Sequence, residues 1–272
     1  MFSSFMVNTW IVATLVAVVA GMVGFFVVLR GSSFAAHALP LGAFPGAAAA
    51  NLLGINEFFC VIVSAGLGVI GISQLSRRGR HDVATALCLV TLLGLGTVFL
   101  SMAREYSQGT YALLFGEVLG VSTGEIVPVA VMSAMVIVAI TLMFRPLLLS
   151  SVSPELAKAN GVSTNRMELC FLTIVAFGTS VALPVVGTLL VFSLMVGPAA
   201  AARSLTNRPI VALFFSIGIA LVTVWASIGF SFISDWPVGF FVGAIGMVSY
   251  VLGRVWDKGG MMLPIRATNE LG

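Results

Sequence analysis

Residues 150–165, SSVSPELAKANGVSTN, are the one long polar interruption in the second half of a chain that is otherwise apolar almost end to end. Ser153 is a typical N-cap residue, Pro154 suits the first helical position, and Glu155 suits the first turn. Gly161 can end the same helix in a left-handed conformation. A helix of about seven residues is unstable alone in water. The stretch therefore predicts a short capped helix at the membrane surface that can bind a soluble partner. The alternative is a capped connecting loop without such a role.

The composition is that of a membrane protein. Hydrophobic residues make up 59% of the 272 residues and charged residues only 8%, whereas soluble domains carry about 25% charged residues. Apolar runs of about 20 residues, enough to span the hydrocarbon core, recur along the chain. Segments of about ten residues alternating in polarity, which would indicate a transmembrane barrel, do not occur. The expected fold is therefore all-α, a single polytopic transmembrane domain over residues 1–272.

The cysteines argue against disulfides and a metal site, and the net charge gives no sign of nucleic-acid binding. All three cysteines fall in apolar runs and no CxxC motif occurs, which favours buried thiols over disulfides or metal ligands. The net charge of +3 is not a nucleic-acid signal, because the positive residues belong to the membrane loops.

The apolar runs predict nine membrane-spanning helices. Their expected ranges are 5–29, 34–54, 56–76, 83–103, 125–149, 166–186, 187–203, 209–233 and 237–254. Residues 104–124 are too short in apolar length to cross and are expected to be interfacial or re-entrant.

The basic residues predict the orientation. If the N-terminus lies outside, only Arg104 of the thirteen Lys and Arg residues falls on the outer side. The others fall at inner ends: Arg30, Arg77, Arg78, Arg80, Arg145, Lys158, Arg166, Arg203, Arg208, Arg254, Lys258 and Arg266. Under the positive-inside rule this places the short capped helix and a tail of residues 255–272 in the cytoplasm.

The second span, FAAHALPLGAFPGAAAANLLG over residues 34–54, differs from the others. Pro40 and Pro45 each remove a backbone donor, so a broken helix is expected, whose freed carbonyls need a neighbour or a wet cavity. Gly46 and the alanines beside it allow another backbone to come close. His37 is the only histidine within a span, and an ionisable residue there is a functional candidate. The alternative is a structural histidine that is hydrogen-bonded near the inner end of its helix.

Helix breaks are also expected in the later pair of spans over residues 166–203. Pro184 and Gly187 predict a sharp turn or break between them. Pro198, which follows a glycine, is expected to break the next helix near its inner end.

Several stretches together resemble the permease subunits of the ABC-3 family of zinc and manganese ABC importers. The matching pieces, in the family's order, are RGSSFAAHALPLGAFPGAA, LLFGEVLGVS, SPELAKANGVS, VGTLLVFSLMVGPAAAARSLT and DWPVG. The resemblance implies a type II importer-like permease in the bacterial plasma membrane. It also implies four kinds of partner: a second copy of the permease, two cytoplasmic ATP-binding subunits, an extracellular metal-binding protein and the lipid membrane.

The resemblance further implies that transport and ATP hydrolysis are carried out by different subunits. The chain itself would bind no cofactor and would not be an enzyme, ATP being hydrolysed by the partner subunit while a divalent metal ion passes as cargo. Residues 153–161 would be the coupling helix that contacts the ATPase. The residues expected to make that contact are Ser153, Pro154, Glu155, Leu156 and Lys158.

The second span departs from the family's pattern, which carries an aspartate and a histidine one helical turn apart. These positions are His37 and Leu41 here. The family's charged pair is thus replaced by one imidazole and one apolar residue, and His37 is expected to contact the passing cation. Glu117 and Glu125 are possible further contributors, although nothing in their spacing requires it.

Three other functions stay open at this point. A self-contained secondary transporter or channel also uses broken helices, often within internal repeats, but no convincing repeat is visible. An ABC permease for a non-metal cargo and a membrane scaffold without transport are the others. No Gly-Lys pair occurs, so the chain has no P-loop and no motor of its own.

Overall fold

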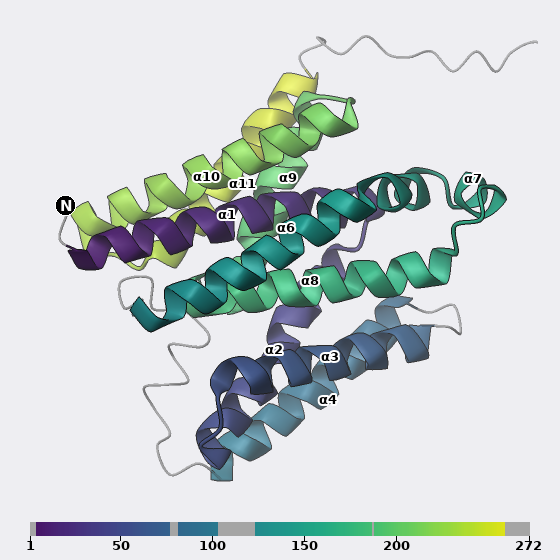
Figure 1. The fold of residues 1–272 in the computed structure, drawn as a ribbon. Helices are drawn as coiled ribbons and strands as arrows, with labels where there is room; N and C mark the ends of the chain where they lie inside the picture. The colour runs from purple at the N-terminus through teal and green to yellow at the C-terminus, as the bar shows by residue number, and fades with distance from the viewer. Residues whose placement is uncertain (1–3, 77–80, 103–122, 187, 259–272) are drawn as a thin grey trace, which may run out of the picture.

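The computed structural model describes residues 4–76, 81–102, 123–186 and 188–258. This part of the chain folds into α-helices, without strands (Figure 1). The helices are α1 (Ser4–Arg30), α2 (Ser33–Leu53), α3 (Glu57–Ser76), α4 (His81–Met102), α6 (Thr123–Val152), α7 (Pro154–Ala159), α8 (Thr164–Val186), α9 (Thr188–Leu205), α10 (Pro209–Ser234) and α11 (Val238–Lys258).

The all-α prediction is confirmed, and each predicted span corresponds to one long helix whose ends lie within a few residues of the expected ones. Five of the described helices are long and apolar enough to cross a membrane. These stretches are Val7–Arg30, Val83–Met102, Ile126–Val152, Pro209–Ser234 and Val238–Trp256. The predicted interfacial piece at 104–124 falls almost entirely outside the described residues. α11 continues to Lys258, and the rest of the predicted tail of residues 255–272 lies outside the described residues.

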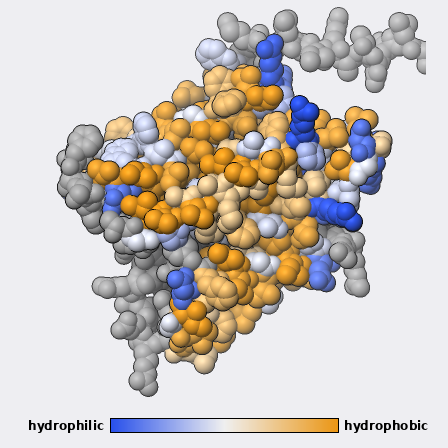
Figure 2. Space-filling view, in the orientation of Figure 1, coloured by the Kyte–Doolittle hydropathy of each residue, from blue (hydrophilic) through white to orange (hydrophobic). Residues whose placement is uncertain are grey.

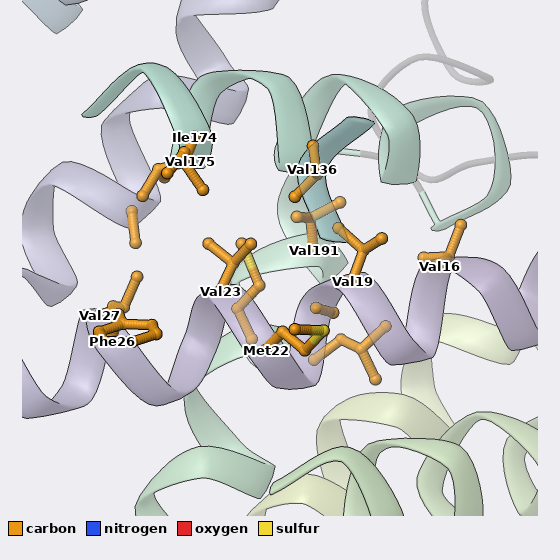
Figure 3. Close-up of a cluster of buried hydrophobic side chains, with 14 of the residues drawn as sticks. Val16, Val19, Met22, Val23, Phe26, Val27, Val136, Ile174, Val175 and Val191 are labelled. Atoms are coloured by element: carbon orange, nitrogen blue, oxygen red, sulfur yellow. The ribbon is translucent and has the colours of Figure 1, made fainter. Parts of the chain in front are cut away.

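α1 is the central helix of the larger group. It contacts α6, α8, α9 and α10, and 72% of its apolar span is buried. Its valines repeat at helical spacing, and Figure 3 shows Val19 and Val23 near Val136 of α6, Val175 of α8 and Val191 of α9. These side chains are all buried, so one helix joins the faces of three others.

Close backbone contacts hold α1 in this position. A methyl group at Gly24 would overlap the backbone of Met195 on α9, so only glycine fits at this crossing. The Ser216 hydroxyl of α10 donates a hydrogen bond of 2.7 Å to the Gly21 carbonyl. Lipid tails are as apolar as the side chains, so close packing and interhelical hydrogen bonds drive helix association in a membrane.

α2 lies between two groups of helices. It packs on α3 and α4 on one side and contacts α8 and α9 on the other (Figure 1). A methyl group at Gly46 would overlap the Cys60 carbonyl of α3, which confirms the close approach predicted there.

The prediction that the second helix is broken was wrong, because α2 continues as an α-helix through Pro40 and Pro45. A proline removes a single intrahelical bond, and neighbouring helices can compensate for it within a membrane protein. Ser64 of α3 donates its hydroxyl to the carbonyl of Gly42, three residues before Pro45. Hydrogen bonding and close packing from α3 thus support the helix where the proline weakens it.

The later proline predictions also need correction. α9 runs through Pro198 to Leu205, so the expected break at Pro198 is absent. The break predicted around Pro184 and Gly187 fits the helix ranges better, since α8 ends at Val186 and α9 begins at Thr188. Gly187 itself lies outside the described residues.

The surface matches a membrane environment. The face seen in Figure 2 is mainly hydrophobic, and most of its strongly hydrophilic residues lie toward the end where α7 projects in Figure 1. Large hydrophobic side chains are widely exposed, for example Leu142 of α6 and Phe214 of α10. Such exposure is normal against lipid but not against water.

The crossing of α1 and α9 gives a stability prediction. Gly24→Ala should lower the stability of the protein by about 1–3 kcal/mol, because overpacking at a backbone contact forces the helices apart. Thermal unfolding of the purified protein in detergent measures the effect. Gly218→Ala is the matched control, since a methyl group at Gly218 meets no atom within 4 Å. Equal melting temperatures for the two variants would contradict the packing account.

Candidate functional site

α7 is a six-residue helix whose two ends are both capped. Ser153 is extended, and its side chain accepts a hydrogen bond from the Leu156 amide at 3.4 Å. Pro154 occupies the first turn, as the sequence predicts. At the other end Gly161 has a φ of 77°. Its amide donates to Lys158 and the next amide donates to Ala157, which is the hydrogen-bond pattern of a Schellman motif.

The burial of α7 separates an anchoring side from an exposed one. Ala157 is fully buried, whereas Leu156 is 58% exposed. Glu155 and Lys158 are exposed as well. α7 is held by contacts with α6 and α8, and it projects from one end of the molecule in Figure 1. The structure therefore places the predicted contact residues together on a capped, exposed helix with an apolar side chain at its centre.

Arg30, the last residue of α1, lies at the base of this helix. Its guanidinium donates hydrogen bonds to the hydroxyls of Ser151, at 2.9 Å, and Ser150, at 2.6 Å, in the last turn of α6. It also stacks 4.6 Å from the ring centroid of Phe171 on α8. The sequence marks Arg30 only as one inner-side charge, because a contact between residues 120 apart has no local signal.

A cavity of about 460 Å³ adjoins these contacts. Arg30, Ser150, Ser151 and Pro154 line one part of it, and Glu168 of α8 lines another. The cavity therefore connects the foot of α7 with the ends of α1 and α8.

His37 lies one turn into α2 and is half-buried. Its ring meets Phe192 of α9 edge-on, with the ring centroids 5.0 Å apart. The Nδ1 atom is buried and has no hydrogen-bond partner among the described residues. The hydrogen-bonded structural histidine considered from the sequence is thus not seen at Nδ1, and the imidazole keeps an unused nitrogen between α2 and α9.

No metal centre surrounds His37 in the part of the chain that the structure describes. No group of three or more His, Cys, Asp or Glu residues there could hold a metal ion. Leu41 follows one turn later on the same face of α2. Glu117 lies outside the described residues, and Glu125 lies in the first turn of α6.

Comparisons with known proteins agree with this architecture. The chain is 32% identical to the manganese import system permease protein ScaB of Streptococcus parasanguinis, over 75% of this chain and 73% of that protein. It is 28% identical to the manganese transport system membrane protein MntC of Halalkalibacterium halodurans, over 88% and 83% of the two chains.

A solved structure has the same fold. It is PsaBC from Streptococcus pneumoniae in complex with Fab. The chain superposes on it with a TM-score of 0.83 and is 25% identical to it in sequence. The superposition covers 92% of this chain and 91% of that one. Residues 2–256 match the sequence profile of the ABC 3 transport family. Since this match covers nearly the whole chain, the protein is a multi-pass membrane protein of the ABC 3 transport family.

Proposed function

We propose that this chain is the permease subunit of an ATP-driven importer whose cargo is a divalent metal ion. The observation that carries the proposal is the capped helix α7, with Ala157 buried and Leu156 exposed, in a chain of the ABC 3 transport family. The relatives named for manganese transport support a metal cargo. Two copies of the permease would bind two ATPase subunits inside and receive cargo from an external metal-binding protein. The chain would then supply the pathway while its partners hydrolyse ATP.

The proposed topology has nine crossings with the N-terminus outside. The long helices of the described residues overlap the nine predicted spans, which supports the proposal, and five of them are long and apolar enough to cross a membrane. The basic residues also gather at the ends that this topology places inside. α7 then faces the cytoplasm, where an ATPase can reach it.

Cysteine labelling tests this orientation. In a variant whose three native cysteines are replaced by alanine, Ser234→Cys at the outer end of α10 should react with a membrane-impermeant maleimide in intact cells. Ser163→Cys, just after α7, should react only after permeabilisation. Both engineered positions lie at helix ends, and the reverse labelling pattern would contradict the topology.

α7 is suited to dock on a soluble subunit. A helix of this length is not stable alone, but its caps and its buried Ala157 hold it in a fixed shape. Leu156 provides an apolar side chain for a pocket on the partner, and Glu155 and Lys158 provide charges around it. A preformed helix needs little ordering on binding, which favours affinity.

Leu156→Asp tests the docking. A carboxylate buried in the contact without a partner costs several kcal/mol, so co-purification of the ATPase should fall by at least about tenfold. Leu156→Met is the matched control and should bind normally, because it keeps the volume and apolarity of the side chain. Circular dichroism checks that the permease stays folded. Normal ATPase binding by the folded aspartate variant would rule out α7 as the docking helix.

His37 is the proposed cargo contact on α2. Its Nδ1 atom is buried and has no hydrogen-bond partner among the described residues, and neutral imidazole is a good ligand for divalent transition metals, zinc in particular. A single imidazole binds weakly, and a transit site must release its cargo.

Uptake by the reconstituted complex tests His37. His37→Ala should reduce transport of zinc or manganese by about tenfold. His37→Asp should restore uptake, because a carboxylate is also a ligand for divalent cations. His81→Ala, which removes the other histidine, is the control. Normal uptake by His37→Ala would exclude His37 as a ligand.

A further inference from the structure

Arg30 connects three helices at the end of the molecule that carries α7. It is the last residue of α1, it donates hydrogen bonds to Ser150 and Ser151 of α6, and it stacks on Phe171 of α8. α7 begins at Pro154, after only Val152 and the cap residue. Arg30 is therefore attached to the last turn of helix before α7.

The hydrogen bonds of the two serines have a defined direction. Ser150 donates its hydroxyl proton to the Leu147 carbonyl at 3.0 Å, and Ser151 donates to the same carbonyl. Both oxygens therefore accept from Arg30, and the guanidinium joins a network that ends at the backbone of α6. A cation at the C-terminal end of a helix also interacts favourably with the helix dipole.

The geometry requires an arginine rather than any positive charge. The guanidinium reaches two hydroxyls through different nitrogens while its Cζ lies over the Phe171 ring. Glu168, which lines the same cavity, adds an electrostatic interaction with Arg30. A lysine ammonium is a point charge without a planar face, so it cannot reproduce this set of contacts.

On its other side Arg30 leads directly into α2. Gly31 has a φ of 66°, and the amides of Gly31 and Ser32 donate to Val28 and Val27. This Schellman motif ends α1 in a fixed turn, and α2 begins at the next residue, Ser33. No flexible linker separates Arg30 from α2.

We propose that Arg30 is the positioning residue that transmits movement of α7 to α2. Its two contacts make one continuous route, from α7 through the last turn of α6 to Arg30 and from Arg30 through the tight turn into α2, which carries His37. This inference rests on the proposed role of α7 as the ATPase-docking helix. When the ATPase subunits move α7, the route shifts the start of α2 and so changes the pathway that α2 lines.

A purely structural role makes a different prediction. If Arg30 only stabilised the fold, its loss would lower expression, ATPase binding, hydrolysis and uptake together. If Arg30 transmits movement, the complex still assembles and hydrolyses ATP, but uptake for each ATP hydrolysed falls. The ratio of uptake to hydrolysis therefore separates the two roles.

The experiment uses the complete permease–ATPase complex in proteoliposomes, with radioactive manganese or zinc as the probe. Arg30→Ala should bind the ATPase as the wild type does and lower the ratio of uptake to hydrolysis about tenfold, the equivalent of one hydrogen bond to a charged group. Arg30→Lys should give a similar loss. Arg254→Ala, which removes an exposed basic residue at the inner end of α11, is the matched control and should leave the ratio unchanged.

A second variant keeps the test sharp if Arg30→Ala does not fold. Ser150→Ala combined with Ser151→Ala removes the acceptors and leaves Arg30 in place, and it should lower the same ratio. Adding Arg30→Ala to this pair should cause no further loss, because members of one network are not additive.

Three results would overturn the proposal: a wild-type ratio in the folded Arg30→Ala variant, full rescue by lysine, or additive losses with the serine variants. Failure of the proposed docking role is seen separately, as normal ATPase binding by Leu156→Asp.

Discussion

The close contact between α1 and its neighbours is the constraint on which the rest of the structure depends. At Gly24 the backbones of α1 and α9 meet with no room for a methyl group, and at Gly21 a hydroxyl from α10 reaches the α1 carbonyl. A membrane offers no large hydrophobic gain for bringing helices together, so such contacts set their positions. Because α1 is held on several sides, its last residue Arg30 is held as well. A fixed Arg30 can then bind α6 and begin the turn into α2.

The sequence was most informative where the physics is local. The length of an apolar run determines whether a helix can cross a membrane, so the ends of the long helices were predicted to within a few residues. The caps of α7 depend on residues within the same short stretch, and Ser153, Pro154 and Gly161 all have the predicted roles.

The predictions failed where tertiary contacts determine whether a helix continues and which side chains meet. Pro40, Pro45 and Pro198 were expected to break their helices, but both helices continue through them, as is possible in membrane proteins where packed neighbours support the helix. The contact between Arg30 and the α6 serines crosses 120 residues and leaves no pattern in the sequence. The sequence could not predict the environment of His37 either, because it depends on Phe192 of a distant helix.

The two proposals, His37 as a cargo contact and Arg30 as a link to α7, together suggest how transport could be controlled. A single imidazole would hold a cation weakly, so the geometry of α2 would decide whether the ion stays or leaves. Arg30 links the start of α2 to α7 through the last turn of α6. Coupling between two sites is reciprocal for binding. If ATPase movement changes the position of His37, a cation held there must in turn favour one arrangement of α7. The same short route would then report the presence of cargo to the ATPase and release that cargo after ATP binding.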